Sequence, residues 1–259
     1  MIEVNEINQN VQGRQVLNQL SCSFGKGRIY GIIGPNGVGK STFLDILSGV
    51  EKPAQGKVLL DGKDIFTYPR KQLARKMAVL QQGGLPPVGF SVREVVGMGR
   101  YPFQSWLGGD ILESESIIDT AIQSMGLKEL THRKMDQLSG GERQRVALAK
   151  LMAQEPSVIL LDEPTTYLDI GYQVQLLDKV RAWQRERDLT VIAVLHDLNL
   201  ASLYCDELVV LHQGTVAAAG TPQEVLTAEL IEQVYETKIS VSAHPLTGSP
   251  QIMLQPSEY

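Results

Sequence analysis

The residues best suited to chemistry in this 259-residue chain form one glycine-rich segment, Gly34-Pro35-Asn36-Gly37-Val38-Gly39-Lys40-Ser41-Thr42. The segment fits the pattern G-x-x-x-x-G-K-S and stands between a predicted strand and a predicted helix, the setting that a phosphate-binding loop requires. Its glycines would let backbone N–H groups surround a β-phosphate, while Lys40 would span the β- and γ-phosphates and Ser41 would offer its hydroxyl to Mg²⁺. The alternative is a glycine-rich turn with an incidental lysine. We expect a nucleoside triphosphate site.

A pair of acidic residues, Asp162 and Glu163, closes the apolar run at 158–161. A strand over that run would deliver both carboxylates to the carboxyl edge of a parallel sheet, where ligands bind in open α/β folds. Such a pair can also do no more than cap a helix. Because a phosphate-binding loop precedes it, we favour a role in phosphate chemistry.

A third segment, Leu138-Ser139-Gly140-Gly141-Glu142, offers a hydroxyl, glycine amides and a helix N-terminus with no phosphate-loop lysine beside it. Together and in this order, the three motifs resemble the ATP-binding cassette (ABC) family. The resemblance implies ATP hydrolysis with Mg²⁺. It also implies a homodimer in the ATP-bound state, because in this family the signature segment meets the ATP of an antiparallel partner subunit. There Ser139, Gly140 and Gly141 would cap the partner's γ-phosphate.

The same resemblance gives roles to three side chains near the expected sheet edge. Asp162 matches the residue that holds Mg²⁺ through water, and Glu163 matches the general base or water-orienting residue. His196 follows a strand expected over Thr190 to Leu195 and matches the switch histidine that contacts the γ-phosphate. A packed or solvated histidine is the alternative for His196.

Two loop residues complete the resemblance. Gln82 matches the glutamine that senses Mg²⁺ or the attacking water, although Gln81 stands beside it, and a solvated loop glutamine is the alternative. Asp169 matches the D-loop that crosses the dimer interface, and it could otherwise cap a helix. The expected catalytic residues are thus Glu163, His196 and Gln82, and the expected Mg²⁺ ligands are Ser41, Gln82 and Asp162.

The periodicity of the chain predicts an α/β fold, a P-loop NTPase core with a parallel sheet. We expect an N-terminal antiparallel β-subdomain, and an inserted helical subdomain at 83–137 with a helix over Glu113 to Met125. Residues 1–82 and 138–219 would form the ATPase core. The remaining 220–259 would be a short extension with one helix, Pro222 to Val234, and a polar end.

Composition excludes several classes of function. The net charge is −5, from 24 basic and 29 acidic residues without a basic tract, which argues against nucleic-acid binding. The two cysteines are isolated among apolar neighbours and are expected to be small buried side chains rather than a disulfide. The N-terminus is unlike a signal peptide, and no apolar stretch approaches the roughly 20 residues of a membrane span. A role at a membrane would therefore need other chains to cross it.

One usual feature of the family is missing from the first strands. ABC proteins commonly stack adenine on an aromatic residue upstream of the phosphate loop, in the region here occupied by Asn10-Val11-Gln12, yet the first aromatic residue of this chain is Phe24. We therefore expect poor discrimination between ATP and GTP. Arg14 is a candidate substitute, because a guanidinium can stack on a base.

Within the family, the chain resembles ATPases that energise import of iron(III)-siderophores. Haem, cobalamin or another metal chelate are the alternative substrates. The rival class is a soluble ABC ATPase not coupled to transport, followed by an exporter. An importer subunit would bind multi-span permease subunits at the cytoplasmic face of the membrane, and would act indirectly with a substrate-binding protein. The residues that carry this resemblance are Gly99-Arg100-Tyr101-Pro102, Tyr167-Leu168-Asp169-Ile170 with Gln173, His196-Asp197-Leu198-Asn199 and Gly220-Thr221-Pro222.

The permease would dock on the insert. The stretch Val88 to Arg100, with Phe90, Val92, Val95 and Val96, could form part of an apolar groove for a permease helix. These residues could equally be the core of the insert itself.

Overall fold

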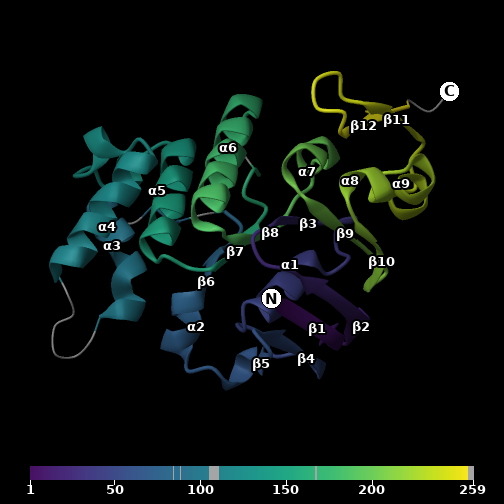
Figure 1. Ribbon diagram of the computed structural model, residues 1–259, viewed down its shortest axis with the longest axis horizontal. Helices are drawn as coiled ribbons and strands as arrows, with labels where there is room; N and C mark the ends of the chain where they lie inside the picture. The colour runs from purple at the N-terminus through teal and green to yellow at the C-terminus, as the bar shows by residue number, and fades with distance from the viewer. Residues whose placement is uncertain (84, 88, 105–110, 167, 256–259) are drawn as a thin grey trace. The chain divides into compact units, whose positions relative to one another are not determined.

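The computed structural model describes residues 1–83, 85–87, 89–104, 111–166 and 168–255. It divides the chain into two compact units, residues 1–67 with 190–259 and residues 68–189 (Figure 1). We call them the first unit and the second unit. Each contains parallel strands, and the antiparallel N-terminal sheet and the helices of the expected α/β fold are present. The boundaries expected for an insert at 83–137 stay a prediction.

Three parallel strands form the centre of the first unit. Strand β3 (Ile29–Ile33) pairs with β8 (Thr190–Val194) on one side and with β9 (Glu207–His212) on the other, and β10 (Thr215–Gly220) continues antiparallel to β9. Every residue of β3 and β8 is buried, as expected for parallel strands covered on both faces. Helix α1 (Lys40–Leu47) follows β3, and α7 (Leu198–Tyr204) follows β8.

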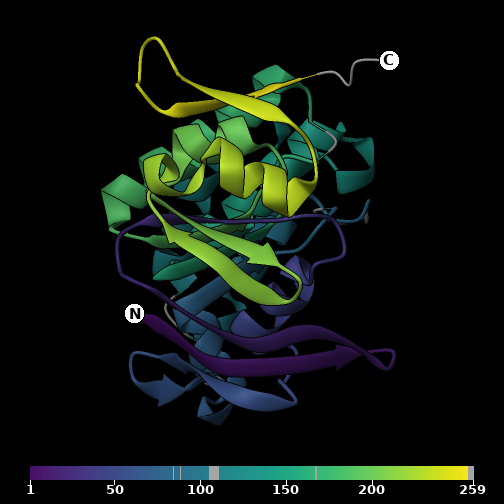
Figure 2. The ribbon, with the colours of Figure 1, turned by 90° about the vertical axis from the view of Figure 1, so that its right-hand side faces the viewer.

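The N-terminal strands form a separate antiparallel sheet of the first unit, in the order β2-β1-β4-β5. Figure 2 shows the long hairpin of β1 and β2 in purple. Ile2, Val4 and Ile7 of β1 are buried in the core, with the alternation interrupted by a register shift between Val4 and Ile7. The strands are β1 (Ile2–Val11), β2 (Arg14–Phe24), β4 (Gln55–Leu60) and β5 (Lys63–Asp64), followed by the 3₁₀ turn η1 (Ile65–Thr67).

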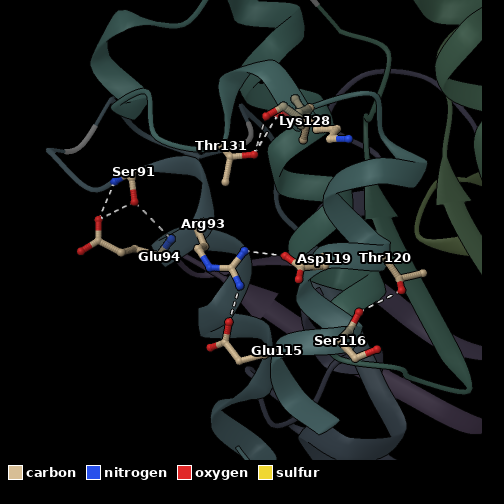
Figure 3. Close-up of polar contacts among 10 residues, drawn as sticks. Ser91, Arg93, Glu94, Glu115, Ser116, Asp119, Thr120, Lys128 and Thr131 are labelled. Atoms are coloured by element: carbon tan, nitrogen blue, oxygen red, sulfur yellow. Dashed lines mark hydrogen bonds and ion pairs between the residues drawn. The ribbon is translucent and has the colours of Figure 1, made fainter. Parts of the chain in front are cut away.

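The second unit is mainly helical, with the parallel pair β6 (Met77–Leu80) and β7 (Val158–Asp162). Helices α3, α4 and α5 pack against one another (Figure 1). The Arg93 guanidinium joins α3 to α4 by ion pairs with Glu115 and Asp119 (Figure 3). The helices are α2 (Arg70–Lys76), α3 (Val92–Gly97), α4 (Ile111–Ser124), α5 (Gly140–Ala153) and α6 (Ile170–Arg187), with 3₁₀ turns η2 (Met98–Phe103), η3 (Lys128–Leu130) and η4 (Met135–Gln137).

The prediction that an apolar groove runs along Val88 to Arg100 is wrong for Val92, Val95 and Val96. Val92 and Val96 are 0% exposed and Val95 is 2% exposed, because this face of α3 is the core of the helical unit. Phe90 differs, since 49% of its surface is exposed. Val88 lies outside the described residues.

In the segment Gly99-Arg100-Tyr101-Pro102, which carries the resemblance to importers, Gly99 and Arg100 are buried and Tyr101 is exposed. A Cβ on Gly99 would lie 2.3 Å from the Lys150 carbonyl oxygen, so only glycine fits this approach to α5. The buried Arg100 guanidinium donates to the Ala153 carbonyl at 2.9 Å and forms an ion pair with Glu155. The Tyr101 side chain, by contrast, is 57% exposed.

The C-terminal extension holds more structure than the single helix expected. The helix over Pro222 to Val234 is instead two, α8 (Pro222–Val225) and α9 (Ala228–Tyr235), because the Thr227 side chain caps a new N-terminus. The end of the chain is a hairpin of β11 (Ile239–Ala243) and β12 (Pro250–Leu254), yellow in Figure 2. The hairpin is bound to α7 by hydrogen bonds, including that from Ser202 Oγ to the Pro250 carbonyl at 2.6 Å.

Both cysteines are free thiols. Cys205 is buried as expected, whereas Cys22 is only half-buried. Across the described part of the chain, no helix combines the length and the apolar character needed to cross a bilayer.

Candidate functional site

The phosphate-binding loop lies where expected, between β3 and α1 of the first unit. Gly39 has φ 103°, and a Cβ there would lie 2.6 Å from Val16 Cγ1, so the loop can follow this path only with glycine. The buried Lys40 ammonium donates to the carbonyls of Gly34 at 2.7 Å and Pro35 at 2.9 Å. Gly39 occupies the N-cap position of α1 and has no side chain with which to cap the helix N-terminus, where Lys40, Ser41 and Thr42 lie.

His196 shares a sheet edge with this loop. Strands β3 and β8 run parallel with Ile32 opposite Val194, so that the chain leaves both strands at the same carboxyl edge. His196 is exposed there, and the Asp197 carboxylate accepts hydrogen bonds from the N-terminus of α7. The first unit thus brings together two of the expected motifs.

The second unit brings together Gln82, Asp162 and Glu163. Strands β6 and β7 run parallel with Leu80 opposite Leu161, and the three residues follow at the carboxyl edge. Gln82 Nε2 donates to Glu163 Oε2 at 2.7 Å, which distinguishes Gln82 from Gln81 as the partner of this carboxylate. Glu163 has φ 48°, a left-handed backbone that is uncommon for any residue but glycine.

The signature segment opens helix α5 with a capping box. Ser139 Oγ accepts from the Glu142 N–H at 3.3 Å, while Glu142 Oε2 accepts from the Ser139 N–H at 2.7 Å and from its hydroxyl at 2.8 Å. Leu138 is buried, whereas Ser139 and Gly140 are exposed. The arrangement fixes the serine hydroxyl at the exposed end of the helix.

Comparisons with known proteins agree with this geometry. Residues 17–166 match the model of the ABC transporter family. The chain belongs to that family. It is 42% identical over 238 residues to the ferric enterobactin transport ATP-binding protein of Escherichia coli K12, covering 92% of this chain and 88% of that protein.

Solved ABC structures share the fold. A metal-chelate type ABC transporter in an inward-facing conformation superposes with a TM-score of 0.84 at 26% identity, covering 99% of this chain and 97% of that one. The dimeric cassette MJ0796 bound to ADP and phosphate gives a TM-score of 0.74 at 26% identity, covering 85% of this chain and 98% of that one. The P-loop NTPase fold expected for this ABC protein is therefore confirmed, and the chain is an ATP-hydrolysing cassette.

Three contacts around the ABC motifs were not expected from the sequence. Thr166 Oγ1 lies 3.1 Å from Glu163 Oε2 and is a second neighbour of that carboxylate. Gln144 Nε2, on the signature helix, donates to the Pro164 carbonyl at 3.0 Å. The Tyr172 ring lies 3.6 Å from where a Cβ on Gly141 would be. Gln144 and Tyr172 link segments that are distant in the chain, so no local pattern predicts their contacts.

Asp169 acts as the cap of α6, with its Oδ1 accepting from the Tyr172 N–H at 2.9 Å. Its expected place at a dimer interface is compatible with this cap and stays a prediction. Tyr167 lies outside the described residues.

The capping box of the signature gives a first prediction. Hydrogen bonds from Ser139 hold the pKa of Glu142 below its usual range, so the box is intact at neutral pH and weakens only as the pH falls through that lowered pKa. Replacing Glu142 by alanine should release the Ser139 hydroxyl. The ATPase rate should fall on the order of tenfold, as for the loss of one hydrogen bond to a charged group.

A matched control exists in the same unit. Ser91 and Glu94 form the same capping box at the start of α3, with the same three hydrogen bonds (Figure 3). Glu94→Ala should lower the melting temperature about as much as Glu142→Ala and leave the ATPase rate unchanged. Equal rates for the two variants would mean that the signature box is only structural.

Proposed function

We propose that this chain is the nucleotide-binding subunit of an importer that takes up iron(III)-siderophores across the cytoplasmic membrane. The observation that carries the proposal is the 42% identity, over nearly the whole chain, to a ferric enterobactin transport ATP-binding protein. The exposed Tyr101 and Phe90 of the second unit support it, because an importer subunit needs a surface for a membrane partner.

In this proposal ATP binds with Mg²⁺, and both the phosphate-binding loop and the residues at the ends of β6 and β7 take part. The loop amides and Lys40 would hold the phosphates. The hydroxyl of Ser41, the carboxylate of Asp162 and the amide oxygen of Gln82 are hard oxygen donors of the kind Mg²⁺ prefers, so the residues fit the ion. Bound Mg²⁺ would neutralise charge on the phosphates.

The protein residues would then supply orientation and proton transfer. Glu163 would orient or deprotonate the attacking water, and Gln82, which already donates to Glu163 Oε2, would fix the orientation of that carboxylate. His196 would contact the γ-phosphate from the edge that it shares with the loop. Ser139, Gly140 and Gly141 would complete the site of a second copy, which makes the active form a homodimer held to permease subunits.

The test of the cargo is uptake by cells that lack this chain. Radioactive iron supplied as a ferric siderophore should enter only when the natural chain is restored, and a Lys40→Ala chain should fail to restore it. Haem and cobalamin, supplied separately, should enter equally with and without the chain. Restored uptake of haem or cobalamin, but not of the siderophore, would contradict the proposed substrate while leaving the ATPase assignment standing.

Docking to a permease gives a second prediction. Because Phe90 is half exposed, Phe90→Asp should keep the fold and the basal ATPase rate and should lower siderophore uptake by an order of magnitude or more, since a charge cannot enter an apolar contact without a partner. Leu246→Asp, which changes an apolar residue that is 90% exposed, is the matched control and should leave uptake intact.

The buried valines separate docking from folding. Val92→Asp would put an unpaired charge in the core of the helical unit, so it should lose the fold and the ATPase activity together. If Phe90→Asp behaved like Val92→Asp, Phe90 would belong to the core and not to a docking surface.

A further inference from the structure

A pocket of about 910 Å³ adjoins the phosphate-binding loop within the first unit. The turn between β1 and β2 contributes Val11 and Arg14, the loop contributes residues 35–38, and the turn between β9 and β10 contributes His212. The end of α9 closes it with Tyr235 and Glu236. The pocket therefore joins the loop to a segment roughly two hundred residues further along the chain.

Val16, which lines this pocket, packs directly against the phosphate-binding loop. A Cβ on Gly39 would lie 2.6 Å from Val16 Cγ1, and a Cβ on Gly214 would lie 2.6 Å from the Val16 carbonyl oxygen. The Asn18 N–H also donates to the Gly214 carbonyl at 2.9 Å. Val16 therefore packs so closely on Gly39 and Gly214 that neither glycine has room for a Cβ, which places this wall of the pocket directly beside the loop that would hold phosphate.

Tyr235 is the aromatic member of the pocket. It is the last residue of α9, and the N–H of the next residue, Glu236, donates to the Glu232 carbonyl at 2.9 Å to end the helix. Burial raises the pKa of Tyr235 to about 12, partly offset by the nearby backbone of Gly34. The phenol is therefore neutral at physiological pH, and Tyr235, whose hydroxyl is hydrogen-bonded to the Gly34 backbone, lines the pocket together with loop residues 35–38.

We propose that Tyr235 of the C-terminal extension is the aromatic contact for the base of ATP bound in this pocket, in place of the ring that the first hairpin lacks. The inference rests on the proposed function and deepens it. A nucleotide whose phosphates lie in the loop must place its base near the loop, and this pocket meets the loop at residues 35–38. No aromatic residue precedes Phe24, so the first hairpin offers Val11 as an apolar neighbour but no ring.

Tyr235 is a base-binding residue here and takes no part in the chemical step. An aromatic ring offers a face to any base without reading its edge, so this contact adds affinity with little selectivity. Discrimination between bases by hydrogen bonding would depend on two exposed residues at the edge of the pocket, Arg14 and Glu236. The position of Tyr235 beyond residue 166 also explains why the matched family region does not contain it.

Two ligands separate base binding from phosphate binding. Dissociation constants are measured, with Mg²⁺, for ATP and for inorganic tripolyphosphate on the natural full-length chain and on Tyr235→Leu, Tyr235→Ala and Tyr235→Phe. Leucine keeps apolar packing at the end of α9, and phenylalanine keeps the ring. For the leucine and alanine variants the dissociation constant of ATP should rise on the order of tenfold, as expected for a lost base contact, with that of tripolyphosphate unchanged. Phenylalanine should behave like the natural chain.

Each other outcome has its own meaning. An equal rise for ATP and tripolyphosphate in the leucine variant would show that Tyr235 only supports the loop, and unchanged ATP binding would show that the base lies elsewhere; either result overturns the inference. If the natural chain bound neither ligand, the proposed function itself would fail. Melting temperatures of all four chains establish that each is folded.

Discussion

Replacing Glu163 by glutamine is expected to leave ATP binding intact and to lower the rate of hydrolysis by two or more orders of magnitude. Glu163 Oε2 accepts from Gln82 Nε2 at 2.7 Å, and an amide oxygen can accept the same hydrogen bond. The variant therefore keeps the shape of the site. It loses the carboxylate that can take a proton from water, a contribution typically of 10²- to 10⁴-fold.

The same variant should accumulate as a dimer, because two bound ATP molecules that are not hydrolysed would hold the subunits together. Phosphate release, ATP binding and size-exclusion chromatography with ATP and Mg²⁺ measure the three properties. Glu186→Gln makes the same chemical change at an exposed position of α6 and should alter none of them. A Glu163→Gln chain that stayed monomeric and fully active would contradict the proposed role of Glu163.

The arrangement of Gln82 and Glu163 could be predicted because strand ends determine it. Each residue follows an apolar run short enough to be one strand, and parallel pairing of β6 with β7 then brings both to one edge. The same rule places His196 at the edge of the phosphate loop, since β3 and β8 pair in parallel. Spacing from the end of a strand is local information, and a single sequence contains it.

The predictions that failed concern residues whose surroundings depend on tertiary packing. Apolar spacing along α3 shows which face is covered, but it cannot show whether α5 of the same chain or a partner protein covers it. In the extension, Thr227 restarts a helix that the apolar pattern alone would continue. Tyr235 reaches the phosphate loop across about two hundred residues, and no periodicity relates positions so far apart.

The largest qualitative effect is expected when two inactive chains are combined. In the proposed antiparallel dimer each ATP site would take the phosphate loop of one copy and the signature of the other. Lys40→Ala removes the ammonium of the loop, and Ser139→Arg fills the exposed start of α5 with a large cation. Homodimers of either variant carry a lesion in both sites and should neither retain labelled ATP in a dimer nor hydrolyse it.

The heterodimer of Lys40→Ala with Ser139→Arg should instead have one intact site and one site with both lesions. Purification through two different affinity tags isolates it, and retention of labelled ATP should then approach one molecule per dimer. The control heterodimer pairs the natural chain with a chain carrying both substitutions, so that each site has one lesion; it should retain none. The reverse result, one retained ATP in the control heterodimer and none in the heterodimer of Lys40→Ala with Ser139→Arg, would mean that the loop and the signature of the same chain form each site.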